Sequence, residues 1–143
     1  MPKVNPNAPG KMVDQKSMKG NIEFKNVEFT YPTRQDLKVL KNFSCTFESG
    51  KTTALVGPSG SGKSTIIQLI ERFYDPCQGS VLIDGTDIKM LDLRSMRHTI
   101  GYVSQEPVLF NTTIKENLLF AKEDATDAEI EQALKDANAW DFI

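Results

Sequence analysis

Eight consecutive residues, Gly57 to Ser64, have the residue types and spacing that bind phosphate. Their sequence, GPSGSGKS, matches the pattern G-x-x-x-x-G-K-[ST]. Glycines let the backbone adopt positive φ angles and approach a ligand closely, so the N–H groups from about Gly60 to Thr65 can point inward to an anion. Lys63 adds a positive charge for the β and γ phosphates, and Ser64 offers a hydroxyl ligand to Mg²⁺.

The sequence therefore predicts a phosphate-binding loop (P-loop) rather than the alternative, a plain glycine-rich turn between a strand and a helix. The nucleotide-binding candidates in this stretch are Gly57, Pro58, Ser59, Gly60, Ser61, Gly62, Lys63, Ser64 and Thr65.

The loop must be positioned by the elements on either side of it. The apolar run TTALVG, residues 52–57, is typical of a short strand buried on both faces of a sheet. The run 63–75 predicts a helix whose apolar face comprises Ile66, Leu69, Ile70 and Phe73. Pro76 and Gly79 are expected to end it.

The remaining pattern predicts an α/β fold. A slip in alternation at Lys25-Asn26 indicates two strand pieces separated by a turn or bulge, and Asp84-Gly85 indicates a hairpin. Thr126 is the expected N-cap of the last helix. The other predicted elements are a strand in 39–50, a short helix in 91–99, a buried strand in 100–105, and helices in 113–120 and 126–140.

Composition restricts the class of protein. The 143 residues allow one domain, and the net charge of −2 gives no reason to expect nucleic acid. No apolar run approaches the roughly 18 to 20 residues that span a bilayer, and the N-terminus has no signal-peptide core. We therefore expect a cytosolic chain in which Cys45 and Cys77 are reduced thiols. Residues 1–20 are expected to form a flexible linker before the folded domain.

Several stretches around the P-loop carry a family resemblance. They are IEFKNVEFTYPTR, VLKNFSCTFESGKTTALVGPSGSGKSTIIQLIERFYDP and GSVLIDGTDIKMLDLRSMRHTIGYVSQEPVLFNTTIKENL. From about residue 21 to the end, the chain resembles the ATP-binding domain of ABC transporters, most closely the P-glycoprotein-like multidrug-resistance exporters. The resemblance implies a P-loop NTPase core with an antiparallel β subdomain over residues 21–143, and a helical subdomain starting at about residue 113.

The resemblance also implies roles for single residues. Tyr31 falls where the family places an aromatic ring that stacks on adenine; the alternative is a tyrosine that closes the end of a strand over the core. Val39 flanks the base or ribose, although a core valine is as good an interpretation. Gln105 corresponds to the family's Q-loop glutamine. The resemblance implies that Gln105 and Ser64 are ligands of Mg²⁺, and that Gln105 and Lys63 are catalytic residues.

Two partners follow from the same resemblance. The loop after Gln105, with Pro107, Phe110 and Asn111, resembles the surface that receives a helix of the membrane domain. Val108 and Leu109 either join that surface or pack into the domain's own core. The second partner is another ATP-binding domain, in a head-to-tail dimer.

The implied function is the MgATP-binding part of an ATP-driven exporter at the cytoplasmic face of a membrane. The 143 residues contain no LSGGQ-like signature and no Walker B run ending in Asp-Glu. They also contain no switch histidine, because the single histidine, His98, is not at the position that the family uses for it. The chain is therefore expected to be truncated before these elements, and to bind ATP but hardly hydrolyse it. The alternatives are a non-catalytic nucleotide-binding or regulatory module and a small-metabolite P-loop kinase.

Overall fold

The computed structural model describes residues 4–5, 7–106 and 108–143. The chain divides into two compact units, Met1–Gly101 and Tyr102–Ile143. The prediction made for Pro107 lies outside the described residues.

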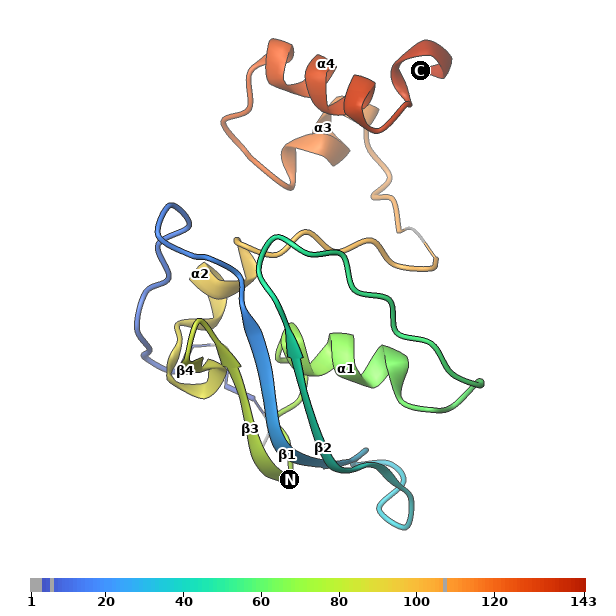
Figure 1. Cartoon of the computed structure of the whole chain (residues 1–143). Helices are drawn as coiled ribbons and strands as arrows, with labels where there is room; N and C mark the ends of the chain where they lie inside the picture. Colours follow the sequence, from blue (N-terminus) through green and yellow to red (C-terminus); the bar gives the residue numbers. More distant parts are fainter. Residues whose placement is uncertain (1–3, 6, 107) are drawn as a thin grey trace. The chain divides into compact units, whose positions relative to one another are not determined.

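The first unit is built on a four-stranded sheet in the order β2-β1-β3-β4, with every neighbouring pair antiparallel (Figure 1). Its strands are β1 (Ile22–Thr30), β2 (Lys38–Phe47), β3 (Gln78–Ile83) and β4 (Thr86–Asp87). The predicted bulge in β1 is confirmed, because the pairing register shifts between Phe24 and Val27 and Asn26 has a φ of 48°. This extra residue brings Phe24 and Val27 both into the core.

The predicted hairpin at Asp84-Gly85 is also confirmed. The two residues have φ angles of 49° and 78° and connect β3 to β4, as a two-residue turn with positive φ at both positions requires. The Asp84 carboxylate accepts the backbone N–H groups of Lys19, Gly20 and Asn21. Slight desolvation of this exposed carboxylate raises the pKa of Asp84, but the three hydrogen bonds together lower it by more, so its pKa lies below the ordinary value.

One face of the sheet is covered by helix α1 (Lys63–Ile70), which follows the P-loop (Figure 1). Ile66 and Leu69 of α1 belong to the same buried cluster as Phe24, Phe29 and Val81 of the sheet. The 3-10 turn η1 (Ile88–Met90) and helix α2 (Leu93–Arg97) complete this core with Ile88 and Met96. Burying apolar side chains from both layers is what fixes α1 on the sheet.

The helix after the P-loop is shorter than predicted. It ends at Ile70, because Arg72 adopts a φ of 53° and the chain leaves the helical path there. Phe73 is consequently half-exposed instead of continuing the apolar face, and the Arg97 guanidinium lies 4.8 Å from the centre of its ring. The prediction that Phe73 shares a helical face with Ile66 was wrong.

Two predicted buried strands are absent from the described structure. Residues 52–57 and 100–105 form no strand, and neither run pairs with the sheet. Val56 and Val103 are 93% and 95% exposed. An apolar run can form a buried strand only where neighbouring strands supply hydrogen bonds and a cover. Among the described residues neither run has a strand neighbour, and within the two runs only Leu55 and Ile100 pack against the core cluster.

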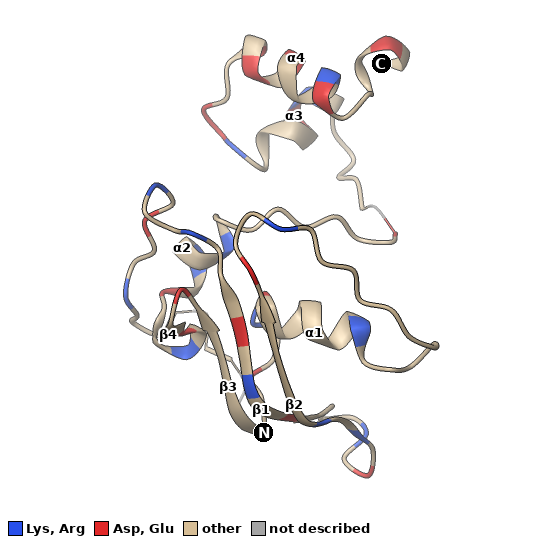
Figure 2. Ribbon diagram, viewed as in Figure 1, with Lys and Arg blue, Asp and Glu red and all other residues tan. Residues whose placement is uncertain are grey.

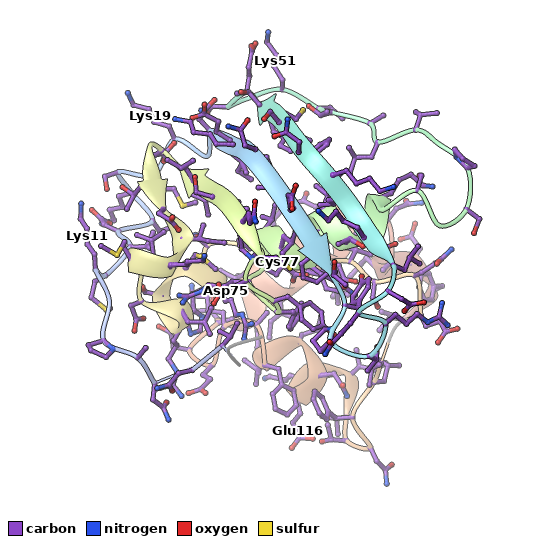
Figure 3. All side chains as sticks on the ribbon, turned by 90° about the horizontal axis from the view of Figure 1, so that it is seen from below. Lys11, Lys19, Lys51, Asp75, Cys77 and Glu116 are labelled. Carbon is purple, nitrogen blue, oxygen red and sulfur yellow. The ribbon has the colours of Figure 1, made fainter. Side chains whose placement is uncertain are left out.

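The described part of residues 1–20 belongs to the first unit and contacts its residues 91–95. Lys11 forms a parallel bridge with Leu91, and the Val13 N–H donates to Ser95 Oγ at 3.0 Å. Figure 3 shows Lys11 and Lys19 on this segment at the margin of the sheet. Its role as a linker stays a prediction.

The second unit contains helix α3 (Ile114–Leu119), helix α4 (Asp127–Asp136) and the 3-10 turn η2 (Trp140–Phe142). Thr126 caps α4 as predicted and forms a capping box with Glu129; Thr113 and Glu116 do the same for α3. Hydrogen bonds from Lys122 and Thr126 lower the pKa of Glu129 to about 2. Helix α4 contains four acidic residues and one basic residue, Lys135, which pairs with Glu131 (Figure 2). No helix in the described ranges has the length and apolar character needed to cross a membrane.

Candidate nucleotide-binding site

The P-loop runs into the N-terminus of α1 through a left-handed turn. Gly60 and Gly62 have φ angles of 79° and 92°, a region that side chains other than glycine rarely adopt. A Cβ atom on Gly62 would lie 3.1 Å from Leu40 Cδ2 and 3.3 Å from Val39 Cγ1. Gly62 therefore provides both the turn and the close approach of the loop to β2.

The first turn of α1 is open to an anion. Gly62 is its N-cap and supplies no side-chain hydrogen bond, and the first turn contains no acidic residue. The first N–H groups of a helix have no intrahelical acceptor, and the helix dipole favours negative charge at this end. Because no side chain caps these N–H groups, a phosphate oxygen is the kind of acceptor that fits them.

The Lys63 ammonium lies over the loop. Its Nζ atom donates to the carbonyl oxygens of Gly57 at 2.8 Å and Pro58 at 2.7 Å, and lies 3.4 Å from Ser61 Oγ. The charge is thus held beside the loop that leads into the uncapped first turn of α1, and within this loop the Ser61 N–H donates to the Pro58 carbonyl at 3.3 Å. Ser59 and Ser61 are exposed on the surface of this loop.

Ser64 and Thr65 differ in solvent exposure. Ser64 is exposed in the first turn of α1, so its hydroxyl is available as a ligand. Thr65 is only 3% exposed, and its hydroxyl is within 2.8 Å of the Tyr31 hydroxyl. Among the described residues, no group of three His, Cys, Asp or Glu side chains could hold a metal ion. A Mg²⁺ ion that is bound mainly by phosphate oxygens and water needs few protein ligands, so the single Ser64 hydroxyl fits that mode.

Tyr31 follows the last residue of β1, and its ring packs against Phe29 and Tyr74, whose own ring centres lie 5.6 Å apart. The ring centre is 5.0 Å from that of Phe29 and 5.4 Å from that of Tyr74, both nearly perpendicular. Its hydroxyl donates to Gln68 Oε1 at 2.8 Å. The side chain is partly buried, and the following Pro32 is exposed at the turn as expected. These contacts match the alternative in which the tyrosine closes the end of a strand, and adenine stacking stays a prediction.

Val39 and Gln105 lie in different units. Val39 is partly buried in β2 and approaches Gly62 at the start of α1. This places Val39 beside the P-loop, whether it serves as a core side chain or also flanks a nucleotide. Gln105 is exposed in the second unit, between Ser104 and Glu106, where Ser104 Oγ donates to the Glu106 carbonyl at 2.6 Å. Its predicted roles in binding Mg²⁺ and in catalysis stay predictions.

Sequence comparison decides the family. The family profile described as "ABC transporter" matches residues 40–143. The chain belongs to the ABC transporter family. This confirms the family that the sequence motifs predicted.

The relatives of this ABC transporter chain are members of the B family. It is 57% identical over 134 residues to "ABC transporter B family member 19" of Arabidopsis thaliana, covering 94% of this chain and 10% of that protein. It is 52% identical over 127 residues to "ATP-binding cassette sub-family B member 5" of Homo sapiens, covering 89% and 10%. The chain therefore spans about a tenth of the length of the curated relatives it matches.

A solved structure supports the same family and fold. The structure described as "a bacterial Atm1-family ABC exporter with ATP bound" is 42% identical, with a TM-score of 0.84, covering 96% of this chain and 23% of that chain. The predicted fold class, a P-loop NTPase core with an antiparallel β subdomain, is thereby confirmed.

The second unit of this ABC transporter chain has an exposed apolar surface. Val108, Leu109 and Phe110 are 81%, 78% and 56% exposed, so the alternative in which the first two pack into the core is not what the structure shows. Phe110 stacks on Phe120 at 4.3 Å between ring centres. These two rings line a cavity of about 430 Å³, together with Thr112, Glu116, Leu119 and Glu123.

Two residues at these sites were not predicted from the sequence. Asn117 accepts the Phe110 N–H and donates to the Phe110 carbonyl, which closes the loop before α3. Gln68 holds the Tyr31 hydroxyl. A signal for Gln68 did exist, because residues three apart on a helix share a face and Gln68 is three residues after Thr65. The sequence could not indicate that Tyr31 would lie beside that face.

Two carboxylates with an acid–base appearance have structural roles. Asp84 anchors the backbone of residues 19–21, and Asp87 caps η1 by accepting the Lys89 N–H. His98 is exposed at the C-terminal end of α2.

Proposed function

We propose that this chain is the MgATP-binding part of an ATP-driven membrane exporter. The observation that carries the proposal is the uncapped N-terminus of α1 with the Lys63 ammonium held over the preceding loop. An anion of high charge density fits this arrangement, and the family match narrows it to a nucleoside triphosphate. The likeness to an exporter described with ATP bound favours ATP and export.

Each residue of the site has a proposed role in binding. The N–H groups of residues 60–65 bind the phosphate oxygens, and Lys63 exchanges its loop carbonyl acceptors for the β and γ phosphates. Ser64 provides one hydroxyl ligand to Mg²⁺, and Gln105 provides an amide oxygen. Tyr31 stacks on the adenine, with Val39 beside the base or ribose.

The bound nucleotide supplies a transferable phosphoryl group, and the protein's part in its hydrolysis is positioning and charge stabilisation. The 143 residues contain no Walker B aspartate, catalytic glutamate or signature loop. We therefore propose that this chain alone binds MgATP with little or no turnover. An ATPase rate equal to that of an intact ABC domain would contradict this part of the proposal.

The proposed partners use two surfaces. A helix of a transmembrane domain binds the exposed apolar surface after Gln105, formed by Val108, Leu109 and Phe110, because such a patch is otherwise costly in water. A second ATP-binding domain closes over the P-loop in a head-to-tail dimer. With the transmembrane partner bound, the proposed location of the domain is the cytoplasmic face of a membrane.

Titration of the purified chain with MgATP, by calorimetry, tests the proposal at Lys63. One charge-assisted hydrogen bond is worth about 1.5 to 3 kcal/mol. Lys63→Ala should therefore weaken binding by roughly ten- to a hundredfold. Lys51→Ala is the matched control, because Lys51 is exposed at the end of the sheet and pairs with Glu48 (Figure 3). Equal affinities for Lys63→Ala and the parent chain would refute the role given to Lys63.

A further inference from the structure

Two hydrogen bonds of the Tyr31 hydroxyl connect the end of β1 to α1. The Tyr31 hydroxyl donates to Gln68 Oε1 at 2.8 Å and lies 2.8 Å from Thr65 Oγ1. Because the single Tyr31 proton is directed to Gln68, Thr65 is the donor in the second bond. The Tyr31 hydroxyl oxygen is thereby bonded to two residues that lie 34 and 37 positions later in the sequence.

The same tyrosine ring is held from its sides. Phe29 and Tyr74 contact it in nearly perpendicular geometry, at interplanar angles of 83° and 89°. Two aromatic contacts and two hydrogen bonds together define both the position and the rotation of the ring. A phenol with a free hydroxyl would keep only the aromatic contacts and could tilt about them.

The two hydrogen-bonding partners belong to the helix that begins at the P-loop. Thr65 lies two residues after Lys63, and Gln68 lies about one helical turn further on. Thr65 is buried, so its hydroxyl has a structural partner rather than solvent. The position of the Tyr31 ring is therefore set from the same helix whose N-terminus is open to phosphate.

We propose that Gln68 is a positioning residue that sets the preference for an adenine base through Tyr31. Gln68 itself touches no nucleotide in this proposal. It holds the ring at a fixed place relative to the P-loop, so the base and the triphosphate meet one preformed surface. The inference rests on the proposed nucleotide-binding function, and in particular on stacking by Tyr31.

The expected signature is a loss that depends on the base. Without Gln68 the ring must be ordered when the nucleotide binds, and ordering a side chain on binding lowers affinity. Gln68→Leu should weaken binding of MgATP by about two- to tenfold and leave binding of magnesium tripolyphosphate unchanged. Tyr31→Phe, which keeps the ring and removes the hydroxyl, should produce the same change in the ratio of the two dissociation constants.

The experiment measures both dissociation constants for the full chain and its variants by competition with a fluorescent nucleotide. Gln68→Glu keeps an acceptor oxygen and should preserve the parent ratio. Gln132→Leu makes the same substitution on the exposed side of α4 and should change neither constant. Circular dichroism confirms that each variant is folded; if Gln68→Leu is not, Tyr31→Phe decides the result.

The outcomes separate this inference from the proposed function. A parent chain that binds no MgATP overturns both. If Tyr31→Ala lowers the preference for MgATP over tripolyphosphate but Gln68→Leu and Tyr31→Phe do not, only the positioning role is overturned. A parallel loss of both ligands in Gln68→Leu also overturns it, because that result indicates a general disturbance of α1.

Discussion

Gly62 shows how much of the P-loop depends on one missing side chain. It combines a φ of 92° with contact to Val39 and Leu40 of β2. Gly60 has a similar φ of 79° but nothing within 4 Å of a Cβ added there. The two glycines thus separate backbone strain from close packing within a single loop. Lys63 follows Gly62 directly, so the position of its ammonium depends on the same turn.

Replacing these glycines by alanine should cost different amounts of stability. The left-handed conformation alone costs roughly 1 to 2 kcal/mol for an alanine, so Gly60→Ala should lower the free energy of unfolding by about that amount. Gly62→Ala should lower it by about 1 kcal/mol more, because Leu40 and Val39 must also move. Urea denaturation followed by circular dichroism measures both. An equal or smaller loss in Gly62→Ala would contradict the packing argument.

At the scale of elements, the C-terminal end of α1 concentrates buried charge. Glu71 is the C-cap and is only 7% exposed, and its Oε2 atom has no hydrogen-bond partner among the described residues. Arg97 donates to the backbone carbonyls of Glu71 and Arg72. Burial raises the pKa of Glu71, and the opposing effect of the Arg97 charge is smaller. The pKa of Glu71 therefore lies above the ordinary value for a glutamate.

The raised pKa of Glu71 predicts a pH dependence of stability. The folded state binds this proton more tightly than the unfolded chain, so the stabilisation is complete below the unfolded pKa and is lost as pH rises through the folded pKa. Glu71→Gln should reduce the fall in the free energy of unfolding as the pH rises above the ordinary glutamate pKa of 4.5. Urea denaturation at several pH values measures this.

Glu106→Gln is the control for that experiment, because Glu106 is exposed. If Glu71→Gln and the parent chain lose stability in parallel over this range, Glu71 is not the group responsible.

At the scale of the whole molecule, two apolar runs remain without strand partners. Val56 and Val103 are almost fully exposed, although their segments have the composition of buried strands. Exposed backbone and apolar side chains in an extended segment favour pairing with another chain. The described structure thus indicates where the isolated chain should associate with itself.

Polar substitution of these two valines should weaken that association. Threonine keeps the shape of valine and replaces one methyl group by a hydroxyl, so Val56→Thr with Val103→Thr removes apolar surface without adding bulk. We expect roughly tenfold weaker self-association for the double variant. Sedimentation velocity over a range of concentrations measures it. Leu37→Thr, at another exposed apolar residue, is the control. Unchanged association of the double variant would show that other surfaces are responsible.

The sequence alone predicted the features that local interactions determine. The P-loop pattern, the Asp84-Gly85 hairpin, the bulge at Asn26 and the Thr126 cap each depend on residues within a few positions of one another. Backbone conformation and neighbouring hydrogen bonds are enough to specify such features. The residue types of the phosphate site could therefore be identified before its geometry was known.

Only the tertiary structure decided the features that depend on distant partners. The contact of Tyr31 with Thr65 and Gln68 joins residues far apart in the chain, and the burial of Glu71 depends on the packing of the whole first unit. The absence of a strand in residues 52–57 has the same origin, because a strand needs neighbours that its own sequence does not specify. Composition indicates that a segment can be buried, and packing determines whether it is.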